Sequence, residues 1–190
     1  MKAEGFFFDL DGTLIPTSHA GGMWHQFLKA LVTASVNSDF VKDLQYHAAS
    51  SIRKKAYYKD ADRFLLGLKN RKNPMPTALV TQINSHLIPH YLEAPRINAV
   101  APFRQVFDYT VTGDMTRHDK TCAYSMAANV LNLKPCDCVA FEDTYAGAKA
   151  ADDAGFNLVI VNNGVTFEKE KGALAKLLPI CTIDCYSELL

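Results

Sequence analysis

An aromatic run that ends in two aspartates constrains this chain more than any other feature. Residues 6–8 are all phenylalanine, Asp9 and Asp11 follow, and Gly12 then offers a place for the chain to turn. Short apolar runs bounded by turn residues are typical of strands buried on both faces of a sheet. Asp9 would then stand at the carboxyl end of such a strand, where open parallel α/β sheets bind their ligands.

Two carboxylates this close together require a physical reason, and a divalent cation supplies one. Mg²⁺ takes carboxylate and carbonyl oxygens and keeps waters and substrate phosphate in its other positions. One carboxylate of such a pair can attack as a nucleophile, while its neighbour, with a raised pKa, passes a proton to the leaving group. The plainer alternative is that Asp9 and Asp11 only shape a turn, as aspartate and glycine often do.

A second acidic pair follows another apolar segment. Residues 138–141 have the pattern of a buried strand, Glu142 and Asp143 come next, and a helical pattern then runs to a glycine. The dipole of that helix could account for one carboxylate at its N-terminus. It does not account for the matching pair at Asp9 and Asp11.

These segments resemble the haloacid dehalogenase-like (HAD) hydrolase superfamily. D-x-D-G-T-L resembles its first motif, and residues 141–155 fit F-E-D-S/T-x-x-G-x-x-A-A-x-x-A-G of the β-phosphoglucomutase and sugar-phosphatase branch at every specified position. The resemblance implies that Asp9 is the nucleophile and Asp11 the acid and then the base. It also implies that Mg²⁺ is held by Asp9, the backbone carbonyl of Asp11, Asp143 and Glu142, the last directly or through a water.

A segment between the acidic pairs resembles the second motif of the family. Residues 78–81 have the pattern of a strand ending at Thr81, after a helical segment over residues 60–71. The resemblance implies that Thr81 hydrogen-bonds the transferring phosphoryl group, as a preorganised donor for developing charge. Threonine is also common in strands that have no such role.

The third motif departs from the pattern of the branch. Residues 107–114 resemble F-D-x-h-h-T-G-D, in which h is apolar, but the lysine expected next is not followed by Pro-x-Pro-Asp. Lys120 has the usual spacing and leads directly into Thr-Cys-Ala-Tyr, so we expect its helix to begin sooner. Its charge would keep Asp9 ionised. Arg117 and His118 are the alternatives for this role.

Strand patterns alternate with helical patterns along most of the chain. Residues 157–161 predict another buried strand, and residues 180–183 predict an edge strand. This alternation favours parallel βαβ units, and we predict an α/β fold with a Rossmann-like, doubly wound and mainly parallel sheet. The length of 190 residues with 48% apolar content suits one core domain and a small appendage.

The appendage is expected within residues 17–58, where the patterns are helical only. We predict a small α-helical cap inserted after the first strand, which leaves residues 1–16 and 59–190 as the HAD-like catalytic core. Caps at this place in the family close over the site and contact the leaving group. Candidate substrate-facing side chains in it are His19, His25, Arg53, Lys54 and Tyr57.

Composition and charge argue against several other classes of protein. The formal net charge is zero and no basic block is present, so we expect no nucleic-acid partner. No apolar stretch is long enough to span a membrane, and the first residues do not resemble a signal peptide, so we expect a cytoplasmic protein. The five cysteines lack the pairing of a zinc site and are expected to be free thiols.

The sequence therefore predicts a Mg²⁺-dependent phosphatase that hydrolyses a small phosphorylated metabolite through an aspartyl-phosphate intermediate. Asp11 favours phosphoryl chemistry, since dehalogenases of the superfamily lack that aspartate. A phosphomutase acting on hexose phosphates stays open, because it uses the same core and differs in how the cap retains its intermediate. A non-catalytic metabolite-binding protein of this fold is a further alternative, and both monomer and homodimer are compatible with the sequence.

Overall fold

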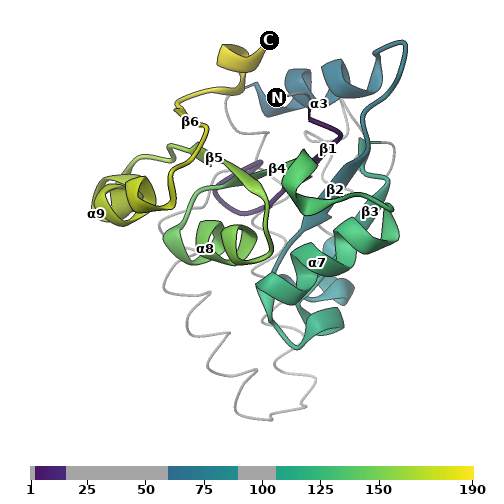
Figure 1. The fold of residues 1–190 in the computed structure, drawn as a ribbon, viewed down its shortest axis with the longest axis horizontal. Coiled ribbons are helices and arrows are strands. Elements are labelled where there is room, and N and C mark those ends of the chain that lie inside the picture. The colour runs from purple at the N-terminus through teal and green to yellow at the C-terminus, as the bar shows by residue number, and fades with distance from the viewer. Residues whose placement is uncertain (1–2, 16–59, 90–105) are drawn as a thin grey trace.

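The computed structural model describes residues 3–15, 60–89 and 106–190, and these form a parallel sheet with helices on both faces (Figure 1). The strands lie in the order β3-β2-β1-β4-β5-β6, and every neighbouring pair is parallel. Their bounds are β1 Gly5–Phe8, β2 Thr77–Val80, β3 Tyr109–Val111, β4 Cys138–Glu142, β5 Asn157–Val161 and β6 Cys181–Ile183. The described α-helices are α3 Ala61–Lys69, α7 Lys120–Val130, α8 Tyr145–Asp153 and α9 Val165–Leu174. Short 3₁₀ turns are η1 Ser85–Leu87, η2 Gly113–Thr116, η3 Pro135–Asp137, η4 Ala175–Leu177 and η5 Tyr186–Leu189.

Alternate residues of the central strands pack into two separate cores, one on each face of the sheet. Phe8 and Phe141 stack with ring centroids 4.6 Å apart in the core that also contains Phe64 of α3. Phe7 and Ala140 face the opposite core, which contains residues of α7, α8 and α9. Successive side chains of a strand point to opposite faces, so continuous apolar strands are what a sheet covered on both sides requires.

This architecture confirms the predicted α/β class, the parallel sheet and the edge position of the last strand. The boundaries differ slightly from the predictions, because β1 already begins at Gly5 and β2 ends at Val80, one residue before Thr81. The predicted helix over residues 60–71 is shorter, since α3 runs from Ala61 to Lys69.

Helices α7 and α8 both begin at a capping side chain. The Asp119 carboxylate accepts a hydrogen bond from the backbone N–H of Cys122, and the Thr144 hydroxyl accepts one from that of Gly147. Such caps satisfy backbone donors that have no partner inside the helix. Helix α7 therefore begins at Lys120, as expected from the missing Pro-x-Pro-Asp.

The expected cap at residues 17–58 lies outside the described residues, as do its five candidate side chains, so the core and cap boundaries stay a prediction. Within the described part of the chain, no helix combines the length and apolar character needed to cross a membrane. The five cysteines are all free.

Candidate active site

The candidate site lies at the carboxyl ends of the central strands. Asp9 follows β1, Thr81 follows β2, and Glu142 and Asp143 close β4. The backbone N–H of Asp9 still donates to the Phe141 carbonyl at 3.1 Å, which continues the β1–β4 pairing by one residue. The sheet therefore fixes the backbone of the site, and all four side chains are buried.

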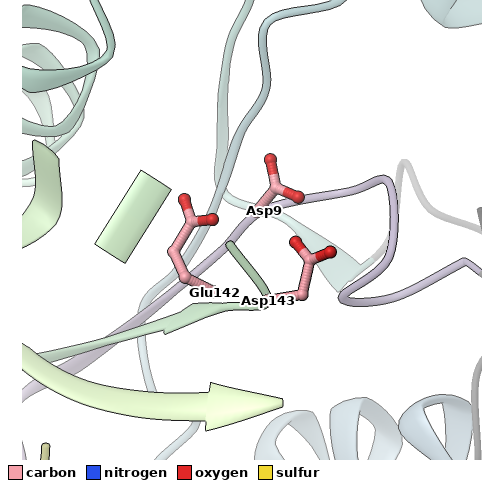
Figure 2. A group of neighbouring side chains, drawn as sticks. All are labelled: Asp9, Glu142 and Asp143. Atoms are coloured by element: carbon pink, nitrogen blue, oxygen red, sulfur yellow. The ribbon is translucent and has the colours of Figure 1, made fainter. Parts of the chain in front are cut away.

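Asp9, Glu142 and Asp143 form a cluster in which one carboxylate oxygen from each lies within 4.8 Å of the others. Figure 2 shows their side chains gathered at the ends of β1 and β4, with the carboxylates pointing to the same side. Three buried carboxylates repel one another strongly unless positive charge compensates them. Oxygen ligands of this kind suit a hard divalent cation, so the cluster could hold a metal ion.

Lys120 supplies one compensating charge. Its Nζ lies 2.6 Å from Asp9 Oδ1 and 2.6 Å from Glu142 Oε1. Burial alone would lower the pKa of Lys120, but the charges of Asp9 and Glu142 outweigh burial and raise that pKa above its usual value. Lys120 is therefore a permanent cation. The alternatives Arg117 and His118 are exposed, and both have a positive φ in the turn that precedes α7.

Asp143 is oriented by donors to both of its carboxylate oxygens. The Thr13 hydroxyl donates to Oδ1 at 3.2 Å, and the Asn163 amide donates to Oδ2 at 2.6 Å. The backbone of Gly12 lies against the same carboxylate, and a Cβ atom at this position would lie 2.0 Å from Asp143 Oδ2. Gly12 also has a φ of 89°, which favours glycine. The glycine of the first motif therefore serves both the turn and the approach to Asp143.

Without a metal ion, two carboxyl groups of the cluster have pKa values well above the usual range of carboxyl groups. Burial, with the charge of Asp9 adding to it, raises the pKa of Glu142 to about 7. Burial and the charges of Asp9 and Glu142 raise the pKa of Asp143 to about 8. A bound cation would lower both pKa values, because it stabilises the ionised forms.

Thr81 follows β2, the strand next to β1, on a loop that is hydrogen-bonded to the neighbouring strand β3. Its backbone N–H donates to the backbone carbonyl of Val111 at 3.0 Å, and its hydroxyl accepts from the backbone N–H of Ile83 at 3.2 Å. Asp114 joins the loops after β2 and β3, accepting from the Ser85 hydroxyl at 2.6 Å and from its N–H at 2.8 Å. Partial burial opposes ionisation of Asp114, but hydrogen bonds from Ser85 and Thr112 outweigh it and lower the pKa of Asp114 to about 2. The carboxylate that links the two loops is therefore ionised.

Three residues for which the sequence predicted no role complete the surroundings of the site, and one of them, Thr13, belongs to the first motif. Thr13 and Asn163 bind Asp143, and Tyr124 donates its hydroxyl to Glu142 Oε1 at 2.7 Å. The sequence could have pointed to the pair Asn162 and Asn163, because it follows β5 at the same edge of the sheet, but not to Asn163 alone. The cluster found among the described residues does not include the Asp11 side chain, and the ligation expected through the Asp11 backbone carbonyl stays a prediction.

No family model matches the chain. In sequence, 43 residues are 49% identical to YhcW of Bacillus subtilis (strain 168), a protein classed provisionally as a phosphatase. The match covers 23% of this chain and only 20% of that protein.

Several solved structures have a similar fold at low sequence identity. A HAD family hydrolase from Deinococcus radiodurans R1, with bound phosphate and sodium, has a TM-score of 0.70 at 16% identity, over 98% of this chain and 93% of that one. An aspartate-to-asparagine variant of CbbY from Rhodobacter sphaeroides, in complex with xylulose-1,5-bisphosphate, has a TM-score of 0.71 at 18% identity, over 98% and 96%. A β-phosphoglucomutase from Clostridium difficile has a TM-score of 0.70 at 18% identity, over 99% and 93%.

The chain therefore has the fold of the HAD hydrolases, which is the fold that the resemblance of its motifs implies.

Proposed function

We propose that this protein is a Mg²⁺-dependent phosphatase of the HAD type, acting on a small phosphorylated metabolite. The observation that carries the proposal is the meeting of Asp9, Glu142, Asp143 and Lys120 in one buried site. Residues from separate parts of the chain supply a nucleophile, a cation beside it and further acidic ligands. The short match to YhcW agrees with phosphatase chemistry.

The donor set of the cluster fits Mg²⁺. One ammonium does not neutralise three carboxylates, and burial together with the charges of the neighbouring carboxylates raises the pKa values of Glu142 and Asp143. Asp9, Asp143 and the backbone carbonyl of Asp11 would hold the ion, with Glu142 binding directly or through a water. When bound, Mg²⁺ polarises the phosphoryl oxygens and screens the nucleophile from them.

Four residues of the chain carry out the attack, the proton transfers and the stabilisation of charge. The Asp9 carboxylate attacks phosphorus in line, so a bond from Asp9 to phosphorus forms as the bond to the leaving oxygen breaks. Asp11 gives that oxygen a proton, and then takes a proton from the water that attacks the aspartyl-phosphate and releases phosphate. Lys120 and Thr81 stabilise the negative charge on the phosphoryl oxygens.

The two alternatives make different demands on the same site. A phosphomutase would use this chemistry and return the phosphoryl group to its substrate. The fold is also similar to that of a β-phosphoglucomutase, so this reaction is the first alternative. A non-catalytic protein would have no need of a nucleophile held against a lysine. Phosphatase activity is the function that the described residues support best.

Phosphate release from p-nitrophenyl phosphate and from a panel of sugar phosphates, nucleotides and small phosphorylated acids tests this proposal. Mg²⁺-dependent release that EDTA abolishes is the expected result. Interconversion of hexose-phosphate isomers without phosphate release would instead identify a mutase, and binding without any turnover would identify a non-catalytic protein.

Without a cation, the folded protein should lose stability as the pH rises from about 4 to about 8. The pKa values of Glu142 and Asp143 are raised in the folded state, to about 7 and about 8, so in this range the folded chain binds more protons than the unfolded chain. The free energy of unfolding then falls with pH. Thermal unfolding in EDTA measures this, and Asp143→Asn should flatten the dependence.

Mg²⁺ should restore most of the stability at the alkaline end, because it competes with protons for the same oxygens. The rise in Tm on adding Mg²⁺ is therefore expected to be larger at pH 8 than at pH 5.5. An equal rise at both values would contradict the assignment of the acidic cluster as the metal site.

Asn163→Ala should weaken Mg²⁺ binding about tenfold, since residues that orient a ligand typically contribute this much to metal affinity. The Asn163 amide fixes Asp143, and its carbonyl oxygen accepts from the N–H of Phe167 at 3.4 Å. Asn162→Ala is the matched control, because the neighbouring amide donates to Asp184 instead. Calorimetric titration with Mg²⁺ compares them, and equal affinities in the two variants would contradict this role.

A further inference from the structure

The two oxygens of the buried Glu142 carboxylate have different surroundings. Oε1 accepts from the Tyr124 hydroxyl at 2.7 Å and lies 2.6 Å from Lys120 Nζ. Oε2 is buried without a hydrogen-bond partner among the described residues and lies against Gly147, where a Cβ atom would approach it to 2.0 Å. The carboxylate is thus held from one side by two donors and confined from the other by a glycine.

Tyr124 and Lys120 reach this carboxylate from the same helix. They are four residues apart in α7, so their side chains lie on one face. Both residues belong to the helix because α7 begins at Lys120, whereas the related motif has Pro-x-Pro-Asp after its lysine. The Tyr124 ring packs against Phe156 with centroids 5.2 Å apart, and the whole side chain is buried. The helix therefore delivers an ammonium and a rigid hydroxyl donor to one oxygen atom.

We propose that Tyr124 is a positioning residue, which fixes Glu142 and thereby holds the Lys120 ammonium at the phosphoryl site. This inference rests on the proposed phosphatase function. When Asp9 bonds to phosphorus, its carboxylate loses the charge that pairs with Lys120. Glu142 then remains as the anion that keeps the ammonium in place, and it can do so only while Oε1 faces Lys120. The Tyr124 hydroxyl and Gly147 maintain that orientation.

Tyr124→Phe tests the hydroxyl while keeping the ring. Losing a hydrogen bond to a charged group should lower kcat about tenfold and leave KM within about twofold, because the substrate itself loses no contact. Tyr186→Phe is the matched control, since this second fully buried tyrosine donates its hydroxyl to the backbone carbonyl of Thr13 at 3.2 Å. We expect it to retain kcat within about twofold.

Gly147→Ala disturbs the same carboxylate from its other side. The added methyl group cannot coexist with Glu142 Oε2 at its present position, so Glu142 must turn. Alanine is otherwise favoured over glycine within a helix, so α8 should still form. Gly172→Ala in α9 is the control, because a Cβ atom there meets nothing within 4 Å. The kcat of Gly147→Ala should fall as in Tyr124→Phe, and that of Gly172→Ala should not.

A double-mutant cycle identifies the route through Lys120. If Tyr124 acts by positioning Lys120, then Tyr124→Phe should cause little further loss of kcat in a Lys120→Met background. Additive losses, or a Tyr124→Phe variant as active as Tyr186→Phe, would overturn the inference while leaving the phosphatase intact. Circular dichroism checks folding, and Gly147→Ala carries the test if Tyr124→Phe does not fold. A wild type without turnover on any substrate would overturn the proposed function, and the inference with it.

Discussion

Asp9→Asn is expected to abolish phosphate release, with a fall in kcat on the order of 10⁴-fold or more, as is usual when a nucleophile is removed. Asparagine has nearly the same size as aspartate, but its amide does not attack phosphorus. The substitution also removes the anion that lies 2.6 Å from Lys120 Nζ. Initial rates of phosphate release at saturating Mg²⁺ measure the loss.

Asp108→Asn is a suitable control for this substitution. Asp108 is also paired with a lysine, since Lys69 Nζ lies 2.5 Å from its Oδ2, but it precedes β3 at the opposite end of the strands from the site. Its replacement should affect stability and leave kcat within about threefold. Substantial turnover by Asp9→Asn would remove the proposed nucleophile.

Lys120→Met should lower kcat/KM by about 10²- to 10³-fold, the usual effect of removing one preorganised charge that stabilises a transition state. Methionine retains much of the length and apolar surface of the stem. The ammonium contacts Asp9 and Glu142 at 2.6 Å each, so its removal leaves the buried anions without their nearest cation. A Lys120→Arg variant should recover only part of the activity, because guanidinium has a different shape.

Lys69→Met provides the matched comparison, as it breaks an ion pair that lies away from the site. Steady-state kinetics with one substrate on both variants isolates the effect of position from that of losing a lysine. Comparable rates for Lys120→Met and wild type would show that another group, such as Arg117 or His118, meets the phosphoryl charge.

The strand-end pattern was enough to predict which acidic residues meet. Asp9 and the pair at Glu142 and Asp143 are about 130 residues apart in sequence, yet all follow or close parallel strands that lie side by side. Lys120 could be selected by spacing even though the residues after it depart from the motif. In each case the position of the backbone brings the residue to the site. Asp9, Glu142 and Asp143 are at the common edge of parallel strands, and Lys120 is at the start of a helix.

Contacts that depend on side-chain direction could not be predicted in the same way. The motifs assign no role to Tyr124, and only the packing of α7 on the sheet shows its hydroxyl at Glu142. Asn162 and Asn163 are chemically identical neighbours whose side chains point in different directions. The Asn162 amide donates to Asp184, and the Asn163 amide donates to Asp143. The roles assigned to Asp11 and Thr81 stay predictions, because the position of a bound substrate decides them.

The most direct test of the account is to look for the phosphoryl group on Asp9. Wild-type protein is mixed with p-nitrophenyl phosphate and Mg²⁺, quenched in acid within one turnover and digested, and its peptides are weighed by mass spectrometry. The account predicts an acid-stable phosphoryl adduct, labile to hydroxylamine, on the peptide that contains Asp9, and no adduct in Asp9→Asn. Rapid phosphate release with an unmodified Asp9 peptide, or with the adduct on another residue, would contradict it.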